Sequence, residues 1–427
     1  MIRSRSISIS ISALAAVALL TSTAALSLAA AGRLDLSFDD DGIAFSPPGP
    51  ASATSVAIQP DGKIVVAGCS QCELRPRFAV YRYNADGSRD LTFGGGDGIV
   101  KTGFRGDATA YDVALQADGK IVAAGVAIGG SSRPSFALAR FDTEGNLDAT
   151  FGGGDGKVRT RIGFRARATA VAIQADGKIV AGGSTGSRSL ADHATLVRYE
   201  ANGDLDPSFG GDGVVETTLN ADPFSNFQDV IVLPNGRIVG FGDVFAATGQ
   251  RFLSVRYLPS GELDRSFGRD GITTTSLGGD SSGASIARAP DGKLVAAGYV
   301  TRTGQAQRFA VARYSDDGTL DATFSHDGKV TTSVGANEAL AGGVVVQPDL
   351  KIVVVGICCF SSRLALVRYL EDGSLDRAFD GGRATLKVGV FASGGRDVAL
   401  QTDGKIVVLG NFAQGGERFV LARYRAS

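Results

Sequence analysis

Histidine is scarce in this sequence of 427 residues, which contains two, His193 and His326, with one methionine and no tryptophan. Histidine is the usual general base of a hydrolytic triad and the commonest metal ligand. The two histidines fall in different parts of the chain, and no serine or cysteine stands in a recognisable nucleophile motif. Neither a Ser-His-Asp triad nor a histidine-based metal site is therefore supported.

Net charge is also nearly absent, because 43 lysines and arginines are balanced by 44 aspartates and glutamates. The basic residues are spread over the repeats rather than gathered in one patch. Nucleic acids and anionic membranes attract strongly basic surfaces, so we expect neither as a partner. No helical segment is expected after any of the glycine runs, which excludes a phosphate-binding loop.

Long apolar runs are missing except at the start of the chain. Arg3 and Arg5 precede the apolar and small residues of Ile7–Leu20, and Ala29–Ala31 provides a small-residue cleavage site before Gly32. This pattern predicts that residues 1–31 are a signal peptide and that the protein is secreted, to the periplasm or the extracellular space. An N-terminal membrane anchor is the alternative. No later stretch is long enough to cross a bilayer, so the mature chain is expected to lack a transmembrane segment.

Glycine, in contrast, is abundant, with 59 residues against 12 prolines. This composition, with 44% hydrophobic residues, favours a turn-rich all-β protein over a disordered one. Two strings recur seven times, about 57 residues apart. The first resembles QPDGKIVVAG and occurs at 59–68, 116–125, 174–183, 233–242, 289–298, 347–356 and 401–410. The second ends in a basic–aromatic pair, as in FAVYRY, and occurs at 78–83, 136–141, 194–199, 252–257, 309–314, 364–369 and 419–424.

Each repeat is predicted to form four antiparallel strands joined by tight turns. Asp-Gly, the usual first turn, is a strong hairpin signal because both of its positions favour positive φ. Seven such units closing radially predict a single seven-bladed β-propeller over residues 32–427, which leaves few exposed sheet edges. The segment Gly32–Ser46 resembles the second half of a repeat, and the chain ends on the first half. The N-terminal segment is therefore expected to complete the last blade.

The strings QPDGKIVVAG, FAVARY and D-G-x-L-D-x-x-F-G resemble the delta-60 repeat family of bacterial secreted proteins. The resemblance covers 32–427, and the pattern is also similar to NHL-type and lactonase-type propellers. The departures are few: Leu350 replaces a turn glycine, Asn235 replaces a turn aspartate, and Gly381-Gly382 replaces an Asp-Gly pair. The resemblance implies a propeller fold and export, and it implies no settled activity.

An arginine of the second string and an aspartate of the following G-x-L-D segment recur together. The arginine shares its strand face with apolar residues, so it is expected to be buried and to need a partner. We predict structural ion pairs Arg82–Asp90, Arg140–Asp148, Arg198–Asp206, Arg256–Asp264, Arg313–Asp321, Arg368–Asp376 and, across the closure, Arg423–Asp35. The lysines of the Asp-Gly-Lys turns form a predicted ring that their neighbouring aspartates neutralise, although an anion-binding face is the alternative.

The first strand of each repeat starts at a position that varies between repeats: Ser55, Asp112, Ala170, Asp229, Ser285, Gly343 and Asp397. Innermost strands line the channel of a propeller, so three carboxylates and two hydroxyls could converge at its mouth. They are candidate ligand-binding residues, and Asp112, Asp229 and Asp397 are candidate ligands of a hard cation such as Ca²⁺. Ordinary variation at a solvent-facing junction is the alternative.

Four cysteines remain, Cys69, Cys72, Cys358 and Cys359. They fall in the first and sixth repeats, so a shared zinc site is not expected. A disulfide between Cys69 and Cys72 is predicted in an oxidising compartment. The adjacent pair Cys358 and Cys359 either forms a strained vicinal bridge or stays reduced.

These observations favour an exported, monomeric and non-enzymatic binding or scaffold module. The variable loops between the second and third strands, or a propeller face, are expected to bind a protein or a glycan. The alternative is a metal-assisted, calcium-dependent hydrolase or lactonase that uses the carboxylate ring, because propellers support both functions.

Overall fold

The computed structural model describes residues 31–49, 51–129, 133–187, 192–219, 224–335, 338–360, 363–389, 391–413 and 416–426. The predicted signal peptide of residues 1–31 lies, except for Ala31, outside these described residues. Within them, no helix has both the length and the apolar character that crossing a membrane requires.

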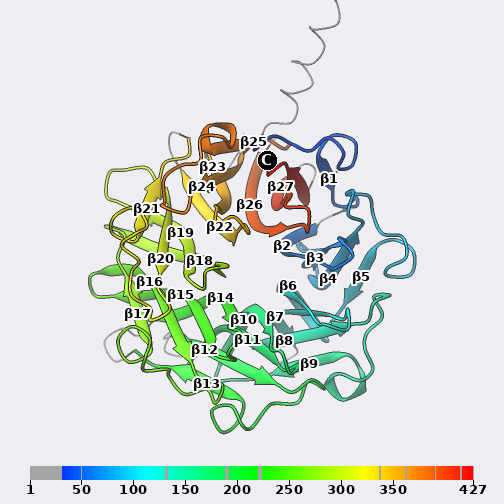
Figure 1. Cartoon of the computed structure of the whole chain (residues 1–427). Coiled ribbons are helices and arrows are strands. Elements are labelled where there is room, and N and C mark those ends of the chain that lie inside the picture. Colours follow the sequence, from blue (N-terminus) through cyan, green and yellow to red (C-terminus); the bar gives the residue numbers. More distant parts are fainter. Residues whose placement is uncertain are drawn as a thin grey trace, which may run out of the picture.

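Seven four-stranded antiparallel sheets surround a central axis (Figure 1). Within each sheet the strands follow one another in chain order, except in the last, where the outermost strand comes from the N-terminal segment. The predicted seven-bladed propeller is confirmed. The helical elements of the described residues are two short 3₁₀ turns, η1 (Gly152–Gly154) and η2 (Asp380–Gly382).

We number the blades in chain order and call their strands a to d from the channel outwards. Blade 1 contains β2 (Ala51–Ile58), β3 (Ile64–Ser70), β4 (Arg77–Tyr83) and β5 (Ile99–Thr102). Blade 2 contains β6 (Gly106–Leu115), β7 (Ile121–Gly129), β8 (Pro134–Phe141) and β9 (Lys157–Thr160). Blade 3 contains β10 (Arg165–Ile173), β11 (Ile179–Gly186), β12 (Asp192–Tyr199) and β13 (Val214–Thr217). Blade 4 contains β14 (Ser225–Val232), β15 (Ile238–Ala246), β16 (Gly249–Tyr257) and β17 (Ile272–Thr275).

Blade 5 contains β18 (Asp280–Arg288), β19 (Leu294–Thr301), β20 (Arg308–Tyr314) and β21 (Lys329–Thr332). Blade 6 contains β22 (Ala339–Val346), β23 (Ile352–Cys358), β24 (Arg363–Tyr369) and β25 (Arg383–Leu386). Blade 7 contains β26 (Phe391–Leu400), β27 (Ile406–Ala413), β28 (Glu417–Tyr424) and, as strand d, β1 (Ile43–Phe45). In β1, Ile43 lies opposite Ala422 of β28, so the N-terminal segment closes the ring as predicted.

The connections between strands divide into two faces. The turn face carries the a–b turns, such as 59–63, and the c–d connections, such as 84–98. The loop face carries the b–c connections, such as 71–76, and the d–a connections to the next blade, such as 103–105. This division follows from the meander, because successive antiparallel strands run in opposite directions.

The core lies between neighbouring blades rather than within one of them. Strands b and c are apolar on both sides, and all seven residues of β3 are buried. One cluster joins Val65 and Val80 of blade 1 to Ala110 and Ile121 of blade 2. Each blade thus buries its two faces against its two neighbours, as in a sandwich of sheets repeated around a ring.

The a–b turns show why Gly recurs after Asp. In six blades this glycine has a φ between 79° and 93°, at Gly62, Gly119, Gly177, Gly236, Gly292 and Gly404. Leu350 occupies the same position in blade 6 with a φ of 66°. Only glycine adopts this left-handed region without a steric penalty, so the sixth turn is strained.

We expect Leu350→Gly to stabilise the protein. It relieves a left-handed conformation that costs about 1–2 kcal/mol, while the greater freedom of glycine in the unfolded chain takes back about 0.4–1 kcal/mol. The net gain in stability is up to about 1.5 kcal/mol. The reciprocal change Gly292→Leu should destabilise blade 5 through the same strain. Urea unfolding of both variants checks this expectation, which is wrong if Gly292→Leu unfolds at the same urea concentration as the wild type.

A buried arginine connects each blade to the next. In blade 5, Arg313 donates to the carboxylate of Asp321 at 2.8 Å, and its guanidinium carbon lies 4.9 Å from the centre of the Phe324 ring. Its Nη1 donates to the backbone carbonyl of Glu371 in blade 6 at 2.5 Å. Lys293 of the a–b turn lies 3.0 Å from the same Asp321 carboxylate. One ion pair therefore links strand c, the c–d connection, the a–b turn and the next blade.

The same arrangement recurs in all seven blades. The nitrogen–oxygen distances of the seven predicted pairs lie between 2.6 and 2.9 Å, including Arg423–Asp35 across the closure. Each arginine also donates to a carbonyl of the following blade, at Thr143, Ala201, Pro259, Asp316, Glu371, Ala426 and Ala85. The turn lysines, and Arg237 in blade 4, lie within 4.0 Å of these same aspartates.

Asp321→Asn should strongly destabilise the protein, although it replaces the carboxylate by an amide of nearly the same size. It removes the charge that faces buried Arg313, and breaking one partner of a buried pair costs about 3–5 kcal/mol. Asp327→Asn in the same blade is the matched control, because Asp327 is exposed and its pair with Lys329 is worth about 0–1 kcal/mol. Denaturant unfolding followed by circular dichroism compares the two, and equal losses would contradict the structural role of the buried pair.

Candidate functional site

The seven variable positions share one backbone feature. In every blade the pairing of strand a with strand b shifts by one residue immediately before them, for example between Ala110 and Asp112 and between Phe227 and Asp229. Such β-bulges redirect the side chain that follows and leave one backbone residue out of the ladder. At Ser55, Asp112, Asp229, Ser285 and Asp397, the side chain that follows the bulge reaches a neighbouring blade.

Asp112 uses both carboxylate oxygens in hydrogen bonds to neighbouring blades. Its Oδ1 accepts from the Ser55 hydroxyl of blade 1 at 2.6 Å and from its own neighbour Val113 N–H at 2.7 Å. Its Oδ2 accepts from the Val171 N–H of blade 3 at 2.7 Å. The side chain thus joins three blades at the inner edge of the ring.

Asp229 and Asp397 repeat the contact with the next blade, so each of them joins two blades. Asp229 accepts from the Ile286 N–H of blade 5 at 2.8 Å and from the Ser285 hydroxyl at 2.9 Å. Asp397 accepts from the Val56 N–H of blade 1 at 2.8 Å. In all three cases the donor N–H belongs to the residue that follows the variable position of the next blade. The carboxylates therefore bind the free N–H groups of an edge strand.

The remaining two variable positions, Ala170 and Gly343, carry no polar side chain. A Cβ added to Gly343 would lie 3.0 Å from the Cα of Asp397, so the glycine makes room for the neighbouring aspartate. The structure thus gives five of the seven predicted positions, Ser55, Asp112, Asp229, Ser285 and Asp397, hydrogen bonds between blades.

Burial of the three carboxylates makes their charged forms unfavourable. Desolvation, followed by the charge of Asp112, raises the pKa of Asp229 to about 7 against the opposing hydrogen bonds. Desolvation also raises the pKa of Asp397 to about 7, with additional repulsion from Asp112 and Asp229. Desolvation also raises the pKa of Asp112. The charge of Asp112 thus contributes to the raised pKa of both Asp229 and Asp397.

The predicted calcium site finds no support in the geometry of these groups. Among the residues that the structure describes, no three His, Cys, Asp or Glu side chains come together as metal ligands would. The three carboxylates of the prediction, Asp112, Asp229 and Asp397, accept hydrogen bonds from N–H groups instead. Calcium binding at Asp112, Asp229 and Asp397 stays a prediction.

The two groups of aspartates should produce opposite pH dependences. A carboxyl whose pKa is raised in the folded state favours folding while it is protonated, so the contribution of Asp229 and Asp397 is complete below about pH 4 and is lost as the pH rises to 7. Burial raises the pKa of Asp90, but hydrogen bonds from Thr92 and the Arg82 charge lower it to about 2, so its contribution is lost as the pH falls from 4 to 2.

We therefore expect the melting temperature to fall on both sides of about pH 4–5. In Asp229→Asn the decline between pH 5 and 8 should become shallower, whatever the absolute stability of the variant. Asp61→Asn in an exposed turn should keep the wild-type slope. Melting curves at constant ionic strength from pH 2 to 9 measure this, and a wild-type slope in Asp229→Asn would contradict the assignment.

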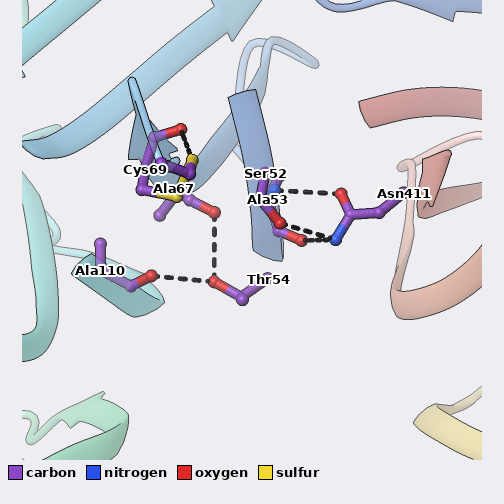
Figure 2. The surroundings of a disulfide bond; sticks show 8 residues. Ser52, Ala53, Thr54, Ala67, Cys69, Ala110 and Asn411 are labelled. Carbon is purple, nitrogen blue, oxygen red and sulfur yellow. Dashed lines mark hydrogen bonds between the residues drawn. A yellow bond between two sulfur atoms is a disulfide. The ribbon is translucent and has the colours of Figure 1, made fainter. Parts of the chain in front are cut away.

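The cysteines lie at the loop-face end of strands b in blades 1 and 6. Cys69 and Cys72 form a disulfide with their Cα atoms 5.6 Å apart (Figure 2). Next to it, Asn411 of blade 7 accepts from the Ala53 N–H at 3.0 Å and donates to the Ala53 carbonyl at 2.9 Å. Cys358 and Cys359 are thiols with Sγ atoms 2.7 Å apart, and burial raises the pKa of Cys358 to about 12.

The turn face contains a wide depression of ≈ 1640 Å³ along blades 1 to 4. Its charged side chains already form ion pairs or hydrogen bonds with residues of the turns and of the buried Arg–Asp pairs. Lys120 pairs with Asp118 at 2.6 Å and lies 3.8 Å from Asp148, and Lys178 lies 2.8 Å from Asp206. The turn lysines therefore neutralise turn and frame aspartates rather than forming an uncompensated anion-binding ring.

Large apolar side chains are exposed mainly on the loop face. Of the ten that are exposed among the described residues, three leucines, at 36, 91 and 205, lie in c–d connections of the turn face. The other seven, with exposed fractions from 37% to 85%, lie at strand ends and connections of the loop face: Phe45, Leu74, Ile128, Phe164, Phe224, Phe245 and Phe360. We call these seven residues the apolar set. All five exposed phenylalanines belong to it.

Sequence reasoning did not single out the apolar set. Phe45, Phe164, Phe224 and Phe245 lie outside the two repeated strings, and only the topology shows that strand ends from different blades meet on one face. The b–c loops that the sequence predicts to be variable, Gly68–Arg77, Gly125–Ser135 and Gly242–Arg251, contain Leu74, Ile128 and Phe245. Parts of the connections between strands b and c, at 130–132, 188–191, 361–362 and 414–415, lie outside the described residues.

Comparisons with known proteins agree with this architecture. The model of a domain of unknown function (DUF5122), described as a beta-propeller, matches one segment in each blade, at residues 59–93, 116–151, 174–209, 233–267, 289–324, 347–379 and 401–427. No curated protein matches the chain. These seven segments together span more than half of the chain.

Two solved structures are similar in fold. Streptogramin B lyase aligns with a TM-score of 0.51 at 9% identity, over 89% of this chain and 97% of that one. A catalytically inactive virginiamycin B lyase from Staphylococcus aureus, with quinupristin, aligns with a TM-score of 0.51 at 9% identity, over 89% and 98%. At this identity the likeness shows the propeller fold alone.

Proposed function

The chain belongs to the DUF5122 β-propeller family, and we propose that it is an exported, non-enzymatic binding or scaffold module for a protein or glycan partner. The apolar set on the loop face carries this proposal. Contiguous or clustered exposed apolar groups on a folded protein mark interaction surfaces, and aromatic side chains dominate the energetics of such surfaces. Export rests on the N-terminal pattern of residues 1–31.

The arrangement of the exposed rings supports a preformed surface. Phe224 and Phe245 of blade 4 make an edge-to-face contact with ring centres 6.4 Å apart. The guanidinium of Arg133 in the b–c connection of blade 2 lies 4.9 Å from the ring centre of Phe164. Rings fixed by such neighbours lose little conformational entropy when a partner covers them.

The carboxylates of the channel support binding over catalysis. A general base or metal ligand needs an oxygen that is available to a substrate or an ion. The carboxylate oxygens of Asp112, Asp229 and Asp397 accept hydrogen bonds from backbone N–H groups of their own and the next blade. Their placement suits a role in joining blades. The metal-assisted hydrolase remains the outcome that the experiment below distinguishes.

The test compares two matched double variants of the purified protein, immobilised and exposed to secreted and surface proteins of the producing cells and to a glycan array. Phe224→Ser with Phe245→Ser removes two rings of the apolar set, and Leu91→Ser with Leu205→Ser removes two exposed leucines of the turn face. We expect the first to weaken a saturable interaction of the wild type by at least about tenfold, because buried aromatic anchors contribute most of the binding energy. The second should bind like the wild type.

Equal binding by both double variants would contradict the loop face as the binding surface. Calcium-dependent hydrolysis of esters or lactones that disappears in Asp229→Asn would instead support the hydrolase. N-terminal sequencing of the exported protein tests the signal peptide separately, and we expect the mature chain to start at Gly32.

A further inference from the structure

We propose that a second, separate site on the loop face binds a polyhydroxylated carboxylate of the size of one hexuronate sugar. The site is a pocket of ≈ 210 Å³ between blades 3 and 4. This volume is below the range of about 300–1,000 Å³ that is typical for drug-sized ligands, so it suits a single small molecule or one residue of a chain. The inference does not depend on the apolar set.

Polar side chains from four strands form the walls of this pocket. Seven of its nine lining residues are polar, and the two others are Pro134 and Ala166. The polar groups on which the argument rests are Arg165 and Arg167 of β10, Ser184 of β11, Asp192 of β12, and Asn226 and Gln228 of β14. Because these strands belong to two adjoining blades, the pocket forms where blades 3 and 4 pack against each other.

The two arginines have different surroundings. Arg165 pairs with Asp192, whose Oδ1 lies 2.9 Å from its Nε and 2.8 Å from its Nη2, and this pair is neutral. Arg167 is exposed, and its guanidinium carbon lies 5.7 Å from the centre of the Tyr111 ring. Within the described part of the chain it forms no ion pair. The pocket therefore presents one uncompensated positive charge on a guanidinium that a ring supports, which suits a single carboxylate.

The remaining groups suit hydroxyls rather than a second charge. Gln228 donates to the side-chain carbonyl of Asn226 at 2.9 Å, and Asn226 also hydrogen-bonds to the Asp243 carboxylate, which leaves the Gln228 carbonyl for a ligand. The Ser184 hydroxyl both donates and accepts. Asp192, which Arg165 neutralises, can accept hydrogen bonds from hydroxyls. The single uncompensated charge of Arg167 matches one carboxylate better than the larger charge of a phosphate or a dicarboxylate. A monoanion with several hydroxyls satisfies all of these groups.

The surrounding sequence adds a long-range attraction for anions. Residues 157–175 contain Lys157, Arg159, Arg161, Arg165 and Arg167 and no acidic residue. Lys157 pairs with Asp155 and Arg165 with Asp192, and the other three arginines form no ion pair among the described residues. The expectation that basic residues are spread evenly over the repeats is therefore wrong for this segment, which includes the connection from blade 2 to blade 3. A local cluster of this kind attracts anions even in a chain with a net charge of −1.

The test titrates the purified protein with D-galacturonate, D-glucuronate, D-galactose and acetate, followed by calorimetry and saturation-transfer NMR. We expect at least one uronate to bind, and galactose and acetate to bind at least about tenfold more weakly, because each lacks one part of the recognition. Added salt should weaken uronate binding. Arg167→Gln should reduce the affinity at least about tenfold, with an unchanged melting temperature that shows the variant is folded.

Arg77→Gln is the matched control, since Arg77 is an exposed arginine at the loop-face end of blade 1. It should bind the uronate like the wild type. Binding of neither uronate overturns the proposal, as does equal affinity for galactose and galacturonate or an unchanged affinity in Arg167→Gln. Equal binding of acetate and the uronates overturns the polyhydroxylated part, because it shows only anion binding. None of these outcomes bears on the partner of the apolar set.

Discussion

The buried guanidinium of each blade is the group around which the frame is arranged. Arg313 has its own aspartate, an aromatic ring and a carbonyl of the next blade as partners, and it is 4% exposed. A buried charge without partners costs several kcal/mol, so these contacts have to form together. Because one of these partners comes from the neighbouring blade, the contacts that complete a blade also attach it to the next blade. At the closure, Arg423 and Asp35 extend this coupling to the N-terminal segment.

The inner edge of the ring depends on a second, irregular set of contacts. Strand a leaves N–H groups without a ladder partner where the bulge interrupts it, and these need acceptors. Asp112, Asp229 and Asp397 supply them at three junctions. Two further acceptors come from strand b. The Asn411 side chain accepts from the Ala53 N–H, and the Asp243 carboxylate accepts from the Gly283 N–H, in strand a of the next blade. Variation at these positions therefore reflects alternative ways to join blades, although it resembles an asymmetric ligand site.

Much of the frame could be predicted from the sequence because it repeats. Seven copies of the same two strings fixed the blade number, the positions of the a–b turns and the Arg–Asp partners, and the half-repeats at both ends indicated the closure by β1. The expected positive φ at both positions of the Asp-Gly turns is wrong for the aspartates, because the glycine alone adopts it. The bulge before Asp112 could not be predicted, since it depends on a register between strands rather than on a residue type. The apolar set and the pocket at Arg167 were missed for a related reason. Their residues lie outside the repeated strings and meet only in three dimensions.

The two faces differ in how their polar and apolar groups are used. On the turn face, the lysines and aspartates of the turns form ion pairs with one another and with the aspartates that hold the arginines. A change there disturbs the frame, because each group has several structural partners. On the loop face, Phe245 and Phe360 are exposed and Arg167 lacks a carboxylate partner among the described residues. Side chains that hold no other part of the structure in place can change without destabilising the fold. This is why we propose the binding surface on the loop face.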